Sequence, residues 1–158
     1  MVQVASSPET WDSDSNYLTV QSMKTYFALG TVVGLPLYSV YHLRKRNKSL
    51  SIQELLNSSS LAGVGAATAG GLVEFSRNSL SDAATLKKRR LLLSTSVSRR
   101  RQDDFATIGA VLGVCVVPAV FWTRASLVYL TTGGLTWGYG SGFMVHHLKR
   151  MSNNPASV

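Results

Sequence analysis

The chain has 158 residues, of which 45% are hydrophobic and 15% are charged, and its formal net charge is +8. This length allows one ordinary soluble domain, but apolar residues gather in blocks and most charged residues lie between the blocks. Twelve of the sixteen Lys and Arg residues lie between Arg44 and Arg101. Beside apolar blocks, such a basic region favours anionic lipid over nucleic acid as its partner. The single cysteine, Cys115, excludes an internal disulfide, and we expect it to be a small buried apolar residue.

Residues 1–22 are polar and rich in Ser, Asp and Thr, and we expect them to form an extended or loosely ordered arm. No basic residue precedes Lys24, whereas Glu9, Asp12 and Asp14 are acidic. This charge pattern is opposite to that of a cleavable mitochondrial presequence, and it also lacks the layout of a secretory signal. Import into an organelle would therefore use internal information.

Residues 23–75 are predicted to form an N-terminal membrane region with one clear span. The stretch from Tyr26 to Leu43 has no charged residue and would be about 27 Å long as a helix, which is enough to cross the hydrocarbon core. Pro36 predicts a mild kink within it. Basic residues at 44, 45, 46 and 48 predict that this helix ends at the membrane–water interface.

A second, softer segment covers residues 59–75. Its small residues form two adjacent stripes, Ala62–Ala66–Gly70 and Gly63–Ala67–Gly71. We expect this segment to span the membrane while enclosed by other helices, because a lipid-exposed helix would carry more Leu and Ile. A glycine-rich loop or a re-entrant segment is the alternative.

Residues 76–104 form a strongly basic segment between the second and third spans. Its leucines are interspersed with cations, which predicts a helix on the membrane surface; a solvated, flexible loop is the alternative. For Glu74, just before this segment, we expect an ion pair with Arg77 rather than a role in proton transfer. The candidate lipid-binding residues are Lys87, Lys88, Arg89, Arg90, Arg99, Arg100 and Arg101.

Residues 105–147 are predicted to form a transmembrane hairpin, followed by a polar tail over residues 148–158. Its spans run from Phe105 to Trp122 and from Ser126 to His146, and the short turn between them forces antiparallel neighbours. The fold class we predict is an all-α integral membrane protein with three glycine-rich transmembrane helices and a fourth at 59–75. Both possible topologies place residues 76–104 on the matrix or cytoplasmic face.

Glycines spaced by four residues recur in these apolar blocks. A glycine costs about 1 kcal/mol relative to alanine in a helix in water, but in lipid a glycine stripe lets another helix approach closely. The candidate helix-packing residues are Gly30, Gly34, Gly109, Gly113, Gly134, Gly138 and Gly142.

No nucleotide-binding loop, CxxC pair, HExxH motif or nucleophile elbow occurs in the sequence, and we expect no catalytic residue, cofactor or metal. His42, His146 and His147 lie at the ends of spans. Histidines on facing helices can bind haem, but such ligands usually lie within the hydrophobic thickness. We therefore expect these three to be interfacial polar residues.

The stretch GGLTWGYGSGFMVHHLKR, with the helix and short turn before it, resembles the C-terminal hairpin of the NUXM-type accessory subunit of mitochondrial respiratory complex I. The resemblance covers residues 104–150 and implies a non-catalytic role packed against core membrane subunits. The repeated small-residue spans also resemble the four-span family of mitochondrial inner-membrane translocases, whose signature is loosely echoed by Arg99, Asp103, Gly109 and Gly113. The GYGSG stretch at 138–142 is similar to the glycine motif of a small cristae-organising subunit, which has two spans and no basic loop.

These observations together predict a multi-pass structural subunit of a mitochondrial inner-membrane complex, with complex I as the favoured assembly. Its expected partners are membrane subunits and anionic phospholipid, including cardiolipin, but not nucleic acid. The alternative is a component of an inner-membrane translocase or of a cristae-organising complex. A channel would place polar groups along one helix face, whereas the main spans carry mostly isolated Ser and Thr residues.

Overall fold

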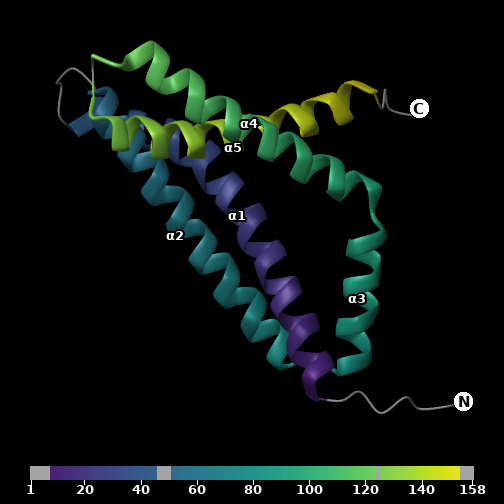
Figure 1. Ribbon diagram of the computed structural model, residues 1–158. Helices are drawn as coiled ribbons and strands as arrows, with labels where there is room; N and C mark the ends of the chain where they lie inside the picture. The colour runs from purple at the N-terminus through teal and green to yellow at the C-terminus, as the bar shows by residue number, and fades with distance from the viewer. Residues whose placement is uncertain (1–7, 46–50, 124, 154–158) are drawn as a thin grey trace, which may run out of the picture.

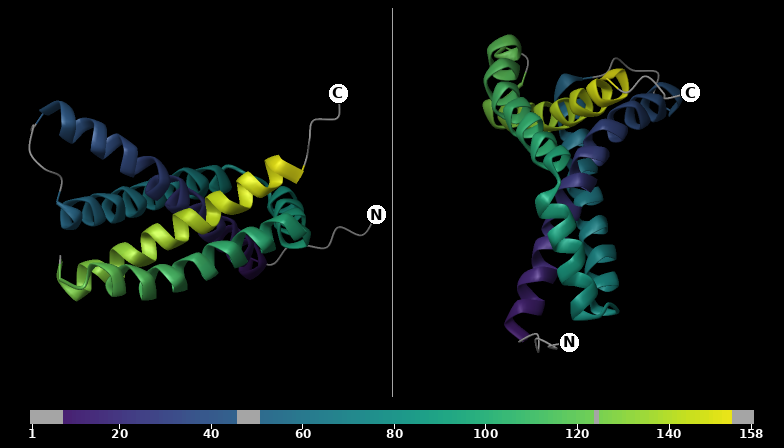
Figure 2. Two further views of the ribbon diagram at one scale, coloured as in Figure 1. Left: turned by 90° about the horizontal axis from the view of Figure 1, so that it is seen from above. Right: turned by 90° about the vertical axis from the view of Figure 1, so that its right-hand side faces the viewer.

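The computed structural model describes residues 8–45, 51–123 and 125–153, and these residues form five helices and no β-strand. The helices are α1 (Pro8–Lys45), α2 (Ile52–Ser79), α3 (Ala83–Thr95), α4 (Val97–Phe121) and α5 (Leu127–Asn153). Helices α1 and α2 form one antiparallel hairpin and α4 and α5 form another, with α3 connecting the two (Figure 1). Viewed from above, α5 lies between α4 and the first hairpin (Figure 2). The all-helical fold class is therefore confirmed.

The N-terminal half of α1 is helical where the sequence predicts an extended arm. The helix begins at Pro8, whose fixed φ and missing N–H suit the first position of a helix. Further along, Asp14, Ser15 and Leu18 are buried, and the side-chain amide of Asn78 donates a hydrogen bond to the carbonyl oxygen of Ser15 at 3.3 Å. The prediction is therefore wrong for residues 8–22, because Asn78 of α2 and Arg90 of α3 bond to this half of α1, at the carbonyl oxygen of Ser15 and the carboxylate of Asp14. Residues 1–7 lie outside the described ranges.

The softer segment, 59–75, lies inside the continuous helix α2. A glycine-rich loop is therefore the wrong alternative here. At 28 residues, α2 is about 42 Å long. Its small residues Gly63, Ala67, Gly70 and Gly71 are buried, whereas large apolar residues point outward. We expected protein to enclose this segment if it spans the membrane, but one apolar face stays exposed: Leu61, Val64, Leu72 and Val73.

The basic segment is helical almost throughout, so the flexible-loop alternative is wrong for it. Helix α2 continues to Ser79, α3 covers the middle of the segment, and α4 already begins at Val97. The corner between α3 and α4 is made by Ser96, whose extended backbone breaks the helix and whose N–H bonds back to the carbonyl oxygen of Leu93 at 3.3 Å. Because of this corner, α3 turns back toward the N-terminal part of α1, and the two helices converge there (Figure 1).

Helices α4 and α5 are antiparallel neighbours, as the short turn predicts, and they form the most extensive helix pair among the described residues. By length and hydropathy, α4 is the single described helix suited to cross a membrane; the mean hydropathy of its most apolar stretch is 2.0 and 11% of that stretch is buried. The other three long helices mix Gly, Ser, Thr or Tyr with their apolar residues, which lowers their hydropathy.

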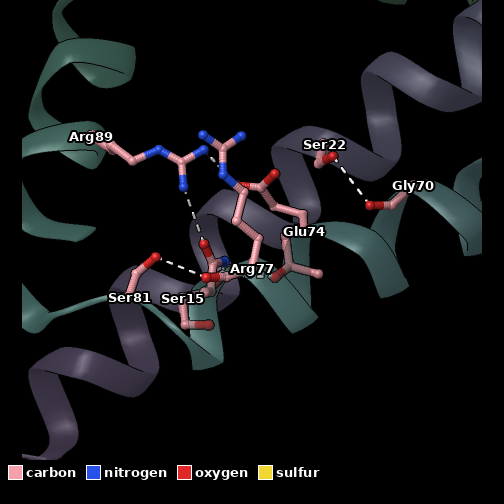
Figure 3. A network of polar contacts seen from close by, with 9 residues as sticks. Ser15, Ser22, Gly70, Glu74, Arg77, Ser81 and Arg89 are labelled. Atoms are coloured by element: carbon pink, nitrogen blue, oxygen red, sulfur yellow. Dashed lines mark hydrogen bonds and ion pairs between the residues drawn. The ribbon is translucent and has the colours of Figure 1, made fainter. Parts of the chain in front are cut away.

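Two ion pairs hold α3 against the first hairpin. Arg89 of α3 donates to a carboxylate oxygen of Glu74 of α2 at 2.7 Å, and Arg90 pairs with Asp14 of α1. Figure 3 shows the guanidinium of Arg89 reaching from α3 toward Glu74. We expected Glu74 to pair with Arg77 one turn away, but Arg77 is exposed and the tertiary partner from α3 takes its place. We call these four residues, Asp14, Glu74, Arg89 and Arg90, the α3 clamp.

Glu74→Gln is predicted to loosen α3. The side chains of Glu74 and Arg89 are 14% and 27% exposed, so their pair is partly desolvated and its loss should cost about 1–2 kcal/mol. That cost corresponds to about a tenfold rise in the opened population of α3. Limited trypsin digestion of the full chain in nanodiscs, timed at Lys87 and Lys88, measures this opening. Asp104→Asn removes an exposed carboxylate and is the control; equal cleavage rates for both variants would contradict the clamp.

Candidate functional site

The crossing of α4 and α5 is built from five glycines. Gly109 and Gly113 of α4 face Gly134, Gly138 and Gly142 of α5. A Cβ atom added at Gly138 would overlap the carbonyl oxygen of Gly109 and lie 3.0 Å from the Cα of Ala110. At Gly113 it would meet the carbonyl oxygen of Gly134 and the Cα of Gly138. The two backbones are therefore in direct contact, and no side chain larger than hydrogen fits between them.

The crossing of α1 and α2 uses glycine on one helix and mainly alanine on the other. A Cβ atom added at Gly30 would lie 2.5 Å from the Cβ of Ala66 and 2.7 Å from the carbonyl oxygen of Ala62. One added at Gly34 would lie 2.5 Å from the Cβ of Ala62. All seven candidate packing glycines therefore lie at crossings within this chain.

A second face of α5, which was not predicted from the sequence, joins the two hairpins. Gly133 packs on Leu56 of α2, and Gly140 packs on Thr31 of α1. The indole N–H of Trp137 donates to the hydroxyl of Ser59 at 2.9 Å. The spacing of seven between Gly133 and Gly140 places both on one helix face, so this pattern was a usable signal. Helix α5 is therefore in contact with α1, α2 and α4.

The glycines of α4 pack on α5 of the same chain, so the opposite surface of α4 is exposed. This outer surface is a large apolar face. Cys115 lies exposed on α4, so our expectation that it is buried is wrong, because α5 covers the glycine side of α4 instead. The exposed large apolar residues of this outer face are Ile108, Val111, Leu112, Val116 and Val120.

The seven candidate lipid-binding residues fall into three groups. Arg89 and Arg90 are neutralised within the α3 clamp. Arg99 is half-buried, and its guanidinium donates to the hydroxyl of Thr25 at 3.4 Å. The remaining candidates are exposed: Lys87, Lys88, Arg100 and Arg101.

The three histidines lie at two different ends of the molecule. His42 is near the end of α1, with its Nε2 3.6 Å from a carboxylate oxygen of Glu54 of α2. His146 is near the end of α5, with its Nε2 3.4 Å from the hydroxyl of Ser98. His42 and His146 are therefore too far apart to share one haem. No group of three or more metal-ligating side chains is present in the described part of the chain.

No protein-family model, curated protein or solved structure matches this chain.

Proposed function

We propose that this chain is a multi-pass, non-catalytic structural subunit of a mitochondrial inner-membrane assembly, with respiratory complex I as the favoured assembly. One observation carries the membrane part of the proposal. Four uncharged stretches, at 26–41, 55–73, 105–121 and 127–145, lie within helices that pack on one another. Each stretch is about 24–29 Å long as a helix, close to the thickness of a bilayer hydrocarbon core.

Polar contacts between helices indicate that the ends of these stretches lie at two shared depths, one on each side of the proposed membrane. At one level, which we call the basic end, Lys24 lies 3.9 Å from Asp103 and Arg99 bonds to Thr25, so that α1 and α4 meet there. His146 brings the end of α5 to the same level through Ser98. At the opposite level, His42 meets Glu54 where α1 ends and α2 begins. Charged residues thus lie at the basic end of all four stretches and, at the opposite level, beside the stretches of α1 and α2.

The polar groups between these levels are consistent with a lipid environment. The hydroxyls of Ser60 and Thr136 lie 3.3 Å apart, and Trp137 bonds to Ser59, so these groups satisfy one another between helices. Such interhelical bonds and small-residue crossings are the two main means of holding membrane helices together. This internal pairing favours a structural subunit over a channel, whose polar groups would line a cavity.

The resemblance of residues 104–150 is the sole support for complex I as the assembly. No contact among the described residues points to that complex. The exposed apolar face of α4 offers a surface that a neighbouring membrane subunit would cover. Association with a translocase or a cristae-organising complex would leave the packing argument intact and overturn this assignment.

A four-span topology predicts that Ser51 and Lys88 lie on opposite sides of the membrane. The basic segment should face the matrix, because loops rich in Lys and Arg are retained on the inner side. In a Cys115→Ser background, Ser51→Cys should react with an impermeant maleimide on intact mitoplasts. Lys88→Cys should react only after permeabilisation. Labelling of both cysteines from one side would exclude a span at α2.

Gly138→Leu should prevent assembly. The leucine side chain cannot fit against the backbone of Gly109, so the α4–α5 hairpin must open. Blue-native electrophoresis of gently solubilised mitochondria, read by an NADH dehydrogenase stain and mass spectrometry, should show the wild-type chain within complex I and the variant outside it.

The matched control is Gly65→Leu, since a Cβ atom at Gly65 meets nothing within 4 Å. This control should insert and assemble normally. Normal assembly of Gly138→Leu would remove the glycine crossing from the proposal.

A further inference from the structure

A cavity of about 700 Å³ opens at the basic end, between α1, α3, α4 and α5. This volume is within the range of about 300–1,000 Å³ that small-molecule sites occupy. Helices α1, α3 and α5 supply its apolar walls. These wall residues are Leu29, Val32, Leu92, Leu93, Phe143 and Met144.

Cations line the same cavity, and none of the described residues that line it is acidic. Arg99, His147 and Arg150 contribute basic side chains, and Ser96 and Ser98 contribute hydroxyls. The α3 clamp gives a sharp contrast, because there each arginine already has a carboxylate partner. The cavity therefore has positive charge that the residues lining it do not neutralise.

The positive charge extends beyond this cavity into a smaller one beside it. The second cavity, of about 450 Å³, shares Ser98 and Arg150 with the first and adds Arg101 and Lys149. Arg99, Arg101, Lys149 and Arg150 thus surround two adjoining hollows at the level where the uncharged stretches end.

We propose that the larger cavity binds one anionic phospholipid, with an acyl chain against Leu29 and Phe143 and the phosphate at Arg99 and Arg150. This inference rests on the proposed membrane location, which places the cavity at the headgroup boundary. A free phosphate would bind the cations but would make no apolar contact with the six wall residues. A zwitterionic lipid would contact the walls but would not neutralise the positive charge of the cavity. An apolar cavity with cations at its edge is complementary to an anionic amphiphile.

The proposal changes which basic residues hold the lipid. Among the candidates from the sequence it keeps Arg99, adds Arg150 and excludes Arg89 and Arg90, which the clamp uses. Lys87 and Lys88 are exposed on α3 and do not line the cavity. These two lysines therefore provide a matched control with the same change in net charge.

Native mass spectrometry of the full chain, titrated with phosphatidylglycerol or phosphatidylcholine in detergent, tests the charge requirement. Arg99→Gln/Arg150→Gln should weaken phosphatidylglycerol binding by about tenfold or more. Lys87→Gln/Lys88→Gln should bind like the wild type. Equal losses in both double variants, no loss in either, or equal wild-type affinity for both lipids would overturn the site.

A second pair of variants tests the apolar walls without changing charge. Leu29→Trp should fill the cavity and lower phosphatidylglycerol binding, whereas Leu37→Trp, at an exposed position of α1 outside the cavity, should not. Circular dichroism and gel filtration report whether each variant is folded. Glycerol 3-phosphate should compete weakly at most; competition as strong as that of the lipid would identify a phosphate site and overturn the proposal.

These measurements separate the lipid site from the proposed function. Selective lipid binding by a chain that migrates outside complex I would reject only the assembly assignment. Co-migration with complex I by a chain that binds no lipid selectively would reject only the site.

Discussion

The direct contact between the backbones of α4 and α5 is the constraint on which the rest of the structure depends. At Gly109, Gly113, Gly134 and Gly138 the two helices approach until glycine carbonyl oxygens occupy the space of absent Cβ atoms. Each glycine weakens its own helix by about 1 kcal/mol relative to alanine. The close approach offsets this cost through many dispersion contacts. Once this face is fixed, Gly133 and Trp137 must point toward the first hairpin.

That geometry changes what the glycines do for a partner. In the sequence alone, a glycine stripe suggests a surface that binds a helix of another protein. In this fold every candidate packing glycine contacts a helix of the same chain. The surface that stays exposed carries large apolar side chains instead, such as Val111 and Val120 on α4 and Leu61 and Leu72 on α2. Such a surface suits lipid or a broad apolar partner better than a close backbone crossing. The glycines therefore set the shape of the subunit, and the aliphatic residues present its outside.

The elements that depend on local pattern can be predicted from the sequence, whereas those that depend on contacts between distant residues cannot. The helical blocks, the antiparallel pair at 105–147 and the small-residue stripes of α2 follow from composition and spacing alone. The helical state of residues 8–22 does not, since Asp14 and Ser15 are buried by α3 and by Asn78, more than sixty positions away. For the same reason, the i,i+3 spacing predicted an ion pair between Glu74 and Arg77, whereas in the fold Glu74 pairs with the distant Arg89. The second face of α5 is marked in the sequence by the seven-residue spacing of Gly133 and Gly140. The more obvious four-residue repeat of Gly134, Gly138 and Gly142 was interpreted in its place.

The basic segment has two distinct uses, and its charge pattern explains both. Arg89 and Arg90 lie in the middle of α3 and find Glu74 and Asp14, which draws α3 back along α1. With α3 held there, Leu92 and Leu93 close one side of the cavity while Arg99, beyond the corner at Ser96, lines it with Arg150. The paired arginines thus position the wall, and the cations without a carboxylate among the lining residues supply the charge. A uniformly solvated loop with the same composition would have neither the wall nor the concentrated charge, so net charge alone could not have revealed this site.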